Sequence, residues 1–530
     1  RYDVFRKNCC LVETDEEPPR PMDREALLLV LDIYQQLNMR IADQLHVMRK
    51  IVVDGSNTSG FQRTALVATN GHLETSQGRV GIDTVALEEE SAGIIETDKS
   101  GTKRYRLDRL GIPLIELATS PDIVSGEHCR EVAEKIGMIL RATGKAARGL
   151  GTIRQDVNIS IPEGARVEIK GVQDLKLIPK IIEIEVNRQK ALLEILEKLR
   201  DTSAEENPRI SDLSSIFSNT DSSFINRGLL SGKRVMGFRL PSHKGILGTE
   251  LQPGKRYGTE LADYAKTAGV KGIIHSDEEP SKYGISEQEA EKVREALGTS
   301  GEDAFVLILA EEGQARMALA RVAERAALRE IPGQTRRVNP DGTTSYMRPL
   351  PGKARMYPET DIRPMEMEEC LLEEARSQAG EGLEAKQEKL EGLLNPEMAK
   401  RMLKSKHLKL FEKFVEMGVE PMLAATTLED TLVALRREGM ELKNPEPALT
   451  TLFEHYLNGE FVKSAIIEIL PGMAEGKQLQ DILEEKQLQK ISGEALEKLV
   501  LEHNKNMGEI MKNYRLRVDA KEVKELMKQC

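Results

Sequence analysis

Two consecutive stretches in the first third of the chain alternate apolar with polar residues, and this pattern predicts a β-hairpin with one polar face. A Pro-Glu-Gly turn at residues 162–164 separates the two stretches. The apolar side of the predicted strands holds Ile153, Val157, Ile159, Val167 and Ile169. The polar side holds Arg154, Asp156, Asn158, Ser160, Arg166, Glu168 and Lys170. This face is either an ordinary solvated sheet surface or the floor of a site for charged groups.

Carboxylate side chains upstream of the hairpin could supply ligands for a metal ion. Glu88 opens a run of three glutamates at residues 88–90, and Glu116 lies between two apolar residues of a predicted strand. A lone glutamate buried on an apolar strand is costly unless it has a cation or a hydrogen-bond partner. Oxygen ligands suited to Mg²⁺ would come from Glu88, Glu116, Asp156 and Glu168. A salt bridge from Arg109 or Arg154 to Glu116 explains the same position equally well.

The composition excludes several classes of protein. The chain has 530 residues, of which 31% are charged, and a net charge of −11, so its surface as a whole does not attract nucleic acid. Local basic excesses occur at residues 400–413, about +5, and at residues 505–530, about +3, where a solvated helix face is the alternative explanation. The five cysteines lack zinc or disulfide spacing and no apolar run could cross a bilayer, so we expect a cytoplasmic protein. The sequence contains no Walker-type phosphate loop, complete dinucleotide fingerprint or evident Ser-His-Asp constellation.

Changes in pattern along the chain predict several domains. Helices are expected over residues 24–48, 123–143 and 176–200, with short strands and turns over residues 49–120. Together they describe an α+β unit built on antiparallel sheet. Residues 201–226 are rich in Ser, Asn and Asp and predict a linker, which is followed by a second alternation of strands and helices. From residue 366 onward the pattern is almost wholly helical.

Five motifs follow one another in an order that is specific to a known family. They are GFQ at 60–62, LEEESAG at 87–93, RLGIPLIELATSPD at 109–122, the hairpin GTIRQDVNIS with RVEIKGVQDL at 151–175, and RMYPETDIRP at 355–364. Together they resemble the GatB/GatE family, the ATP-dependent subunits of Glu-tRNA(Gln) amidotransferase. An additional segment at about residues 205–345 resembles the insertion that marks the archaeal GatE branch of this family.

The resemblance implies an α+β multidomain fold. An antiparallel-sheet catalytic cradle would carry an inserted α+β domain similar to one of aspartyl-tRNA synthetases, followed by helical and tail domains. The implied domains are the cradle at 1–204, the insert at 205–345, a return to the cradle at 346–370, the helical domain at 371–445 and the tRNA-binding tail at 446–530.

The resemblance also implies a two-step reaction that uses ATP and Mg²⁺. The γ-carboxylate of glutamate mischarged on tRNA(Gln) would be phosphorylated, and ammonia would then displace phosphate to give Gln-tRNA(Gln). A partner would make the ammonia: an asparaginase-like glutaminase of the D type, in a heterotetramer of two D and two E subunits.

The resemblance assigns roles to individual residues as well. Glu88 and Glu116 fall at the family's metal-binding positions, and the motif that holds Gly60 and Gln62 is our candidate for cofactor binding. Further candidates follow from the geometry of the polar face of the hairpin more than from the resemblance: Arg154 and Lys170 for stabilising phosphate charge, and Asp156, Asn158 and Glu168 for orienting substrate or metal.

The chain departs from the family pattern at two points. The family opens with a Gly-Leu-Glu-Ile-His segment whose Glu and His contribute to the metal site, and this sequence has no such segment. Either the chain is truncated, as its first residue Arg1 indicates, or the metal site is incomplete and the protein is an inert tRNA-binding scaffold. The glutamate run also carries one extra residue, which leaves the register of the metal ligand open among residues 88–90. An aminoacyl-tRNA synthetase is a third alternative, prompted by the insert but without HIGH-type or KMSKS-type motifs.

Overall fold

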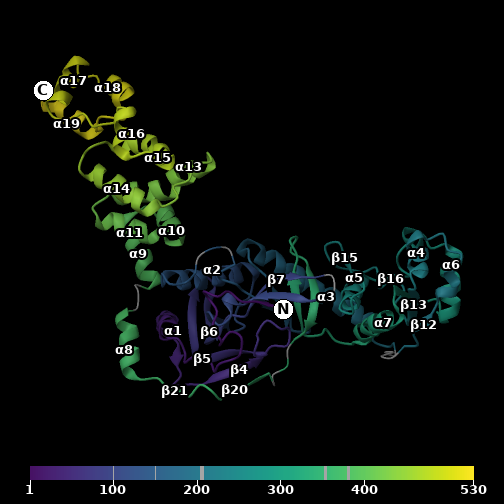
Figure 1. Ribbon diagram of the computed structural model, residues 1–530. Coiled ribbons are helices and arrows are strands. Elements are labelled where there is room, and N and C mark those ends of the chain that lie inside the picture. Colours follow the sequence, from purple (N-terminus) through teal and green to yellow (C-terminus); the bar gives the residue numbers. More distant parts are fainter. Residues whose placement is uncertain are drawn as a thin grey trace. The chain divides into compact units, whose positions relative to one another are not determined.

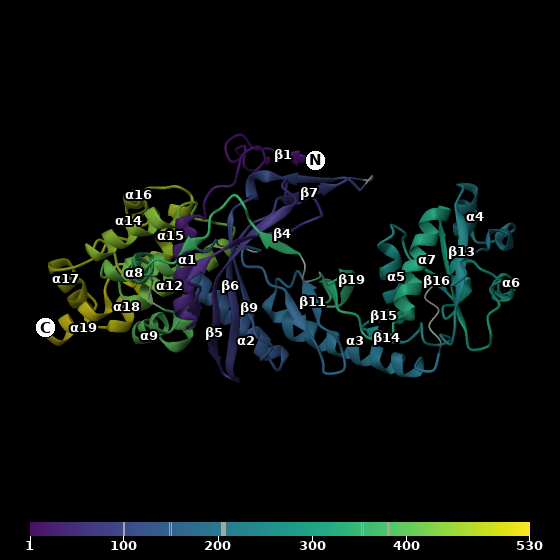
Figure 2. The ribbon, with the colours of Figure 1, turned by 90° about the horizontal axis from the view of Figure 1, so that it is seen from below.

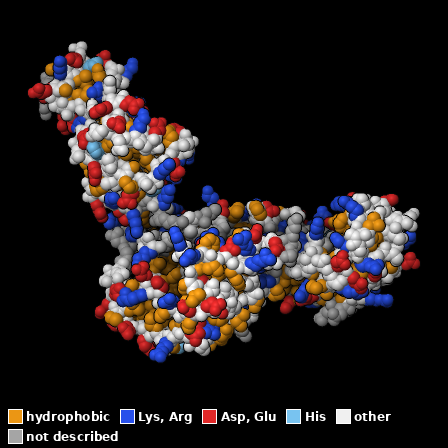
Figure 3. Space-filling view, viewed as in Figure 1, with side chains coloured by type: hydrophobic (Ala, Val, Ile, Leu, Met, Phe, Trp, Pro, Cys, Tyr) orange, Lys and Arg blue, Asp and Glu red, His pale blue; other side chains and the backbone are white. Residues whose placement is uncertain are grey.

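The computed structural model describes residues 1–98, 101–147, 149, 151–202, 208–350, 352, 355–378 and 382–529. The chain divides into two compact units, Arg1–Ala379 and Gly380–Cys530, which are described one at a time (Figure 1). The predicted boundary between residues 204 and 205 lies outside the described residues. On the face shown in Figure 3, acidic and basic side chains are mixed on both units.

The largest sheet of the first unit is antiparallel and contains the strands that carry the candidate carboxylates. Its main path is β20-β4-β5-β6-β9, with β2 pairing beside β5. The bounds are β2 Arg40–Ile41, β4 Val47–Ile51, β5 Phe61–Thr75, β6 Gly78–Glu89, β9 Pro113–Thr119 and β20 Met356–Pro358. Helix α1 (Arg24–Gln36) buries an apolar face and contacts β5 and β6. Smaller sheets are formed by β1 Tyr2–Asp3 with β8 Lys103–Arg106 and β7 Gly93–Thr97, and by β3 Gln44–Leu45 with β21 Met365–Glu366. This architecture confirms the predicted α+β class.

Two asparagines explain where the predicted elements of this region were wrong. The helix predicted over residues 24–48 ends at Gln36, and Asn38 then adopts a left-handed φ of 50°, so the following residues form strands instead. Conversely, only short strands and turns were predicted over residues 49–120, but β5 runs for 15 residues and continues through Asn70, which has a φ of 58°. Asparagine tolerates the left-handed region, and the strand therefore continues through a local irregularity.

The predicted hairpin forms, and it joins a second sheet with the order β10-β11-β18-β19. The strands are β10 Val157–Ile159, β11 Val167–Lys170, β18 Gln334–Val338 and β19 Thr344–Pro349. The apolar side chains of β10 and β11 are buried together with residues of α2 (Gly126–Ala142) and α3 (Ile178–Lys198). Because β10 begins at Val157, Ile153 and Arg154 precede the strand rather than belonging to it. Strand β18 lies parallel to β11, so residues that were predicted to belong mainly to the insert complete the sheet of the hairpin.

The insert is a sheet covered by helices on both faces (Figure 2). The strand order is β12-β13-β17-β16, all antiparallel, with bounds β12 Ser211–Asp212, β13 Arg234–Leu240, β16 Ile274–His275 and β17 Ala304–Ala310. Helices α5 (Tyr257–Lys266) and α7 (Glu312–Ala327) pack on one face, and α4 (Ser223–Leu230) and α6 (Glu287–Leu297) on the other. A short hairpin of β14 (Glu250–Gln252) and β15 (Lys255–Arg256) precedes α5. Both faces of β17 are buried, which explains its unbroken apolar run.

A buried ionic network joins the insert to the sheet of the hairpin. Glu260 on α5 accepts hydrogen bonds from Arg188 on α3 at 2.7 Å, from Arg325 on α7 at 2.8 Å and from Arg336 on β18 at 3.4 Å. Arg188 also pairs with Glu185 at 2.8 Å. All five residues are at most 4% exposed. Although burial opposes ionisation, the arginines hold the pKa of Glu260 far below its usual range, so the carboxylate is charged and its charge is compensated.

The second unit is helical and has two separate cores. The helices of the larger core are α9 Leu383–Leu393, α10 Pro396–Lys404, α11 Leu408–Glu416, α12 Pro421–Thr426, α13 Leu432–Arg437, α14 Pro445–Leu457, α15 Ile466–Ala474 and α16 Leu479–Glu485. The smaller core holds α17 Glu494–Glu502, α18 Met507–Tyr514 and α19 Ala520–Gln529, and α8 Glu369–Gln378 belongs to the first unit. Leu442 and Leu449 lie on either side of the predicted boundary at residue 445, yet both belong to the larger core. Within the described part of the chain, no helix has the length and apolar character needed to cross a membrane.

Candidate functional site

Glu88 and Glu116 lie close together on neighbouring strands of the large sheet. Strand β9 places Glu116 opposite Ala86 of β6, and Glu88 follows two residues later on the same face. The Glu88 side chain is 5% exposed, whereas that of Glu116 is 58% exposed. Burial, the charge of Glu88 and a hydrogen bond with Glu88 raise the pKa of Glu116 to about 7. Two carboxylates in such contact repel one another when both are ionised, so the pair favours a proton or a cation between them.

A lysine that was not predicted from the sequence lies beside this carboxylate pair. Lys50 on β4 forms an ion pair with Glu88, and its Nζ lies 3.9 Å from Oε2 of Glu116. The signal for Lys50 is weak in the sequence, because the contact depends on the pairing of β4 with β5 and of β5 with β6. Lys50 therefore compensates part of the negative charge at the pair.

The Gly60–Gln62 motif contacts the pair as well. Gln62 Nε2 donates to Oε2 of Glu88 at 3.3 Å and to the backbone oxygen of Glu89 at 2.6 Å. Gly60 precedes β5 with a φ of 75°, in the left-handed region that favours glycine, and its backbone oxygen accepts a hydrogen bond from Val52 N. Gln62 thus orients Glu88, and direct contact of Gly60 and Gln62 with a cofactor stays a prediction.

The alternation of β6 shows which of the glutamates at 88–90 shares a face with Glu116. Glu88 lies on the face of Glu116, while Glu89 lies on the opposite face, 3.4 Å from Arg63. Glu90 follows the strand and accepts two hydrogen bonds of 2.8 Å from Arg154. Arg109 also pairs with Glu90, at 3.4 Å. The alternative in which Arg109 or Arg154 pairs with Glu116 is therefore wrong, because the structure gives both arginines another partner.

The polar face of the hairpin forms a connected set of charges. Lys170 Nζ lies 2.5 Å from Oδ2 of Asp156 and 3.2 Å from Oε1 of Glu168. Burial opposes the charged form of Lys170, but these two carboxylates raise its pKa above the usual range, so the ammonium is retained. Asn158 lies opposite Glu168 in the register and is exposed. Asp156 is close enough to Glu116 for its charge to raise the pKa of that residue, which links the hairpin to the carboxylate pair.

The opposite face of the large sheet carries an arginine cluster. Glu359, from the RMYPETDIRP motif, is buried and pairs with Arg49 and, at 2.7 Å, with Arg63. Arg49 also lies over the ring of Phe61, 4.6 Å from its centroid. Burial opposes ionisation of Glu359, yet hydrogen bonds led by that from Arg49 lower its pKa to about 2. This motif therefore anchors β20 to the sheet on the side away from Glu88 and Glu116.

The donor set limits which metal the site could hold. Within the described part of the chain, no group of three or more His, Cys, Asp or Glu side chains is arranged to bind a metal ion. A closed zinc site needs four protein ligands, and these residues do not supply it. Mg²⁺ takes one or two carboxylates and completes its shell with water or phosphate oxygens. Glu88 and Glu116 therefore fit Mg²⁺ held together with a phosphorylated ligand.

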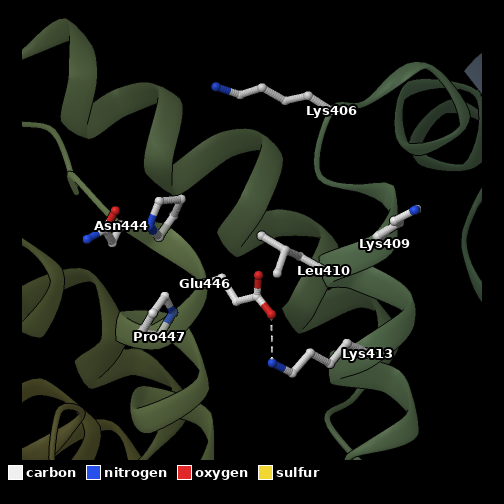
Figure 4. A pocket seen from close by; sticks show the side chains of 8 residues that line it. Lys406, Lys409, Leu410, Lys413, Asn444, Glu446 and Pro447 are labelled. Atoms are coloured by element: carbon white, nitrogen blue, oxygen red, sulfur yellow. Dashed lines mark hydrogen bonds and ion pairs between the residues drawn. The ribbon is translucent and has the colours of Figure 1, made fainter. Parts of the chain in front are cut away.

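A basic groove of about 580 Å³ lies in the helical unit, between α11 and the start of α14 (Figure 4). Its lining includes Lys406, Lys409, Lys413 and Asn444. Lys413 reaches across to Glu446 and forms an ion pair of 2.9 Å (Figure 4). The groove coincides with the basic excess that the sequence shows at residues 400–413.

The fold and the paired carboxylates define an α+β protein with an acidic site suited to a divalent ion. Comparison with known families refines this class: the family model for the GatB/GatE catalytic domain matches residues 6–373, and that for the GatB domain matches residues 409–507. The E-type subunit of glutamyl-tRNA(Gln) amidotransferase from Methanocaldococcus jannaschii is 47% identical over 510 residues, which cover 94% of this chain and 81% of that protein. The protein of the same name from Methanosarcina barkeri is 45% identical over 545 residues, covering 98% and 86%, and that from Pyrococcus furiosus 48% over 499 residues, covering 92% and 79%. The chain therefore belongs to the GatB/GatE family, on its GatE branch.

Proposed function

We propose that the chain is the subunit of a Glu-tRNA(Gln) amidotransferase that activates the glutamate and converts it to glutamine on tRNA(Gln). The relatives described above carry the name of this enzyme's E-type subunit. The observation that carries the proposal is the juxtaposition of Glu88 and Glu116 on adjacent strands, with Asp156 of the hairpin close by. An acidic group of this kind suits the ligand that the reaction needs, a nucleotide phosphate bridged by a divalent ion.

The chemistry assigns a role to each part of the site. ATP bound with Mg²⁺ would supply the phosphoryl group that makes the γ-carboxylate of glutamate reactive toward ammonia. Glu88 and Glu116 would hold the ion, and Gln62 fixes the orientation of Glu88. Arg154 and Lys170 would both stabilise phosphate charge, and carboxylates hold each of them in place: Glu90 holds Arg154, and Asp156 and Glu168 hold Lys170. Asp156, Asn158 and Glu168 orient the substrate and Lys170.

The proposal includes partners. The relatives are named as one subunit of an enzyme, which implies other subunits, and a glutaminase of the asparaginase-like D type would supply ammonia in an assembly of two D and two E subunits. For tRNA, the basic groove of the helical unit supplies lysine ammonium groups that suit phosphate oxygens.

Lys406→Gln is expected to weaken tRNA(Gln) binding and to reduce the slope of log affinity against log salt by about 1. Lys477→Gln, which breaks an exposed ion pair with Glu485, serves as control, and equal salt slopes for the two variants would contradict this role of the groove.

Ammonium-dependent synthesis tests the proposal without the partner. The purified full chain, with ATP, Mg²⁺, ammonium and Glu-tRNA(Gln), is expected to form Gln-tRNA(Gln), which is detected by separating the amino acids released from the tRNA. Omission of ATP is expected to abolish the product. If tRNA binds tightly but no product forms, the non-catalytic tRNA-binding scaffold is the better description.

A further inference from the structure

The side chains on the two faces of β18 contact different groups. Thr335 is fully buried, and its Oγ1 donates a hydrogen bond of 2.8 Å to Oε2 of Glu168. The next residue, Arg336, points to the other face, where it contacts Glu260 at 3.4 Å and Oγ1 of Thr344 at 2.7 Å. Adjacent residues of β18 therefore make different contacts: Thr335 contacts the polar face of the hairpin, and Arg336 belongs to the buried ionic network.

The parallel register fixes this arrangement. Thr335 is the partner of Glu168, and Arg336 is the partner of Ile169. Because β18 follows the insert in the chain and Glu260 belongs to α5 of the insert, the position of Thr335 depends on the packing of the insert against the sheet. The network has no exposed member, so β18 is held along its buried side.

The two oxygens of Glu168 have different donors. Oε1 lies 3.2 Å from Lys170 Nζ, and Oε2 accepts from Thr335. Lys170 in turn holds Asp156 at 2.5 Å. The terminal torsion of a glutamate is broad, so a carboxylate with one donor can rotate, whereas a carboxylate with a donor on each oxygen is fixed. Removal of the Thr335 hydroxyl would free Glu168 to rotate, and Lys170 would then keep Asp156 as its only fixed carboxylate partner of the two.

We propose that Thr335 is a positioning residue for the amidotransferase reaction, which fixes Glu168 and thereby the Lys170 ammonium, while Arg336 and Glu260 hold Thr335 in place. This inference rests on the proposed function, because it concerns the same polar face of the hairpin. It gives the insert a part in the reaction that requires no contact with tRNA. The sequence carries no local signal for it, since Thr335 and Glu168 are 167 residues apart.

Three variants of the full chain test this inference in ammonium-dependent synthesis of Gln-tRNA(Gln). Thr335→Val keeps the shape of the side chain without its hydroxyl, and kcat is expected to fall by about 10-fold with KM for Glu-tRNA(Gln) within about 2-fold. Thr335→Ser keeps the hydroxyl and is expected to restore kcat to within about 3-fold of the original protein. Glu168→Gln reports whether the Glu168 carboxylate matters at all. As a control, Thr220→Val removes a buried hydroxyl within the insert and is expected to leave kcat unchanged.

The outcomes separate this inference from the proposed function. If Glu168→Gln loses activity but Thr335→Val keeps the kcat of the original protein, the positioning role is overturned and the proposed function stands. If Thr335→Ser loses as much as Thr335→Val, the packing of the methyl group matters rather than the hydroxyl, and the role is also overturned. If Glu168→Gln and Thr335→Val are both fully active, the assignment of this face to the reaction fails as well. Should Thr335→Val not fold, Thr335→Ala provides the same comparison.

Discussion

The first unit contains two clusters of acidic and basic side chains that differ in how completely their charges are compensated. In the buried network, both oxygens of Glu260 accept hydrogen bonds from arginine, and its pKa is depressed despite burial. At the sheet surface, the Glu116 side chain is 58% exposed, and the partial burial of its carboxyl group together with the neighbouring Glu88 raises its pKa to about 7. The pKa values of the glutamates in the two clusters are therefore shifted in opposite directions. A compensated cluster stabilises the fold, whereas an acidic cluster without enough cations is a candidate for ligand binding.

The largest effect is expected when the compensated cluster is broken. Glu260→Gln leaves three buried arginines facing Glu185 alone, and we expect a loss of about 3–5 kcal/mol in the free energy of unfolding. Denaturant unfolding of the full chain measures this change. Glu324→Gln, which breaks an exposed ion pair with Arg321, is the matched control and is expected to change stability by less than about 1 kcal/mol. If Glu260→Gln and Glu324→Gln lowered the free energy of unfolding equally, the buried network would not contribute to stability in the way proposed.

The opposite result is expected at the carboxylate pair. Glu116→Gln removes one of the two proposed metal ligands and is expected to lower ammonium-dependent turnover by about 100-fold or more, because the ion would lose half of its proposed protein ligands. Stability is expected to stay the same or to rise, since the repulsion between Glu88 and Glu116 is relieved. Measurements of turnover and of unfolding on the same preparation test the expected loss of activity and the expected stability. Full activity of this variant would contradict the metal role.

The dependence of stability on pH tests the comparison of the two clusters at Glu359. This residue is a compensated carboxylate on the other face of the sheet that carries Glu116. Its pKa in the folded protein is about 2, against an ordinary value of 4.5, since hydrogen bonds led by that from Arg49 outweigh burial. A depressed pKa contributes stability that is fully present above pH 4.5 and is lost as the pH falls from 4.5 toward 2. Glu359→Gln is expected to lower stability at neutral pH by about 1–3 kcal/mol.

The same variant is also expected to weaken the dependence of stability on pH in that acidic window. Unfolding experiments at a series of pH values measure the slope. An unchanged slope would show that Glu359 does not contribute to the acid sensitivity, and that its pairing with Arg49 and Arg63 matters less than the geometry indicates.

The smallest effect is expected at Lys50. Its ammonium competes with a metal ion for Glu88, so Lys50→Met is expected to tighten binding of Mg²⁺ by about 3–10-fold in the absence of nucleotide. Calorimetric titration measures the change. Weaker binding in this variant would mean that Lys50 supports the geometry of the carboxylates instead of competing with the ion.

Local patterns predicted the parts of the site that depend on one strand or one hairpin. The alternation at residues 157–159 and 167–170 predicted which side chains of the hairpin are buried. Glu88 and Glu116 lie on different strands, and their proximity was predicted from the resemblance of the motifs to the family rather than from a local pattern. Lys50 and Thr335 could not be predicted, because their contacts arise from strands that pair across the sheet rather than from neighbours in sequence. The choice among the three glutamates at 88–90 also required the register of β6 with β9.

In the helical unit, local sequence patterns likewise did not show which helices pack together in one domain. Sequence breaks predicted a boundary at residue 445, where Asn444-Pro445 begins α14. The packing does not divide there, because Leu442 and Leu449 share one core, and a second core starts only at Leu496. A turn signal marks the end of a helix but does not show whether the helices on either side pack together.

Binding of a divalent ion is the most direct test of the carboxylate pair. Mn²⁺, which replaces Mg²⁺ at oxygen sites and is detected by electron paramagnetic resonance, can be titrated into the original chain, Glu116→Gln and Glu324→Gln in the presence of ATP. We expect Glu116→Gln to weaken binding by at least about 10-fold and Glu324→Gln to leave it unchanged. Equal Mn²⁺ affinity in all three proteins would contradict the assignment of Glu88 and Glu116 as the metal ligands.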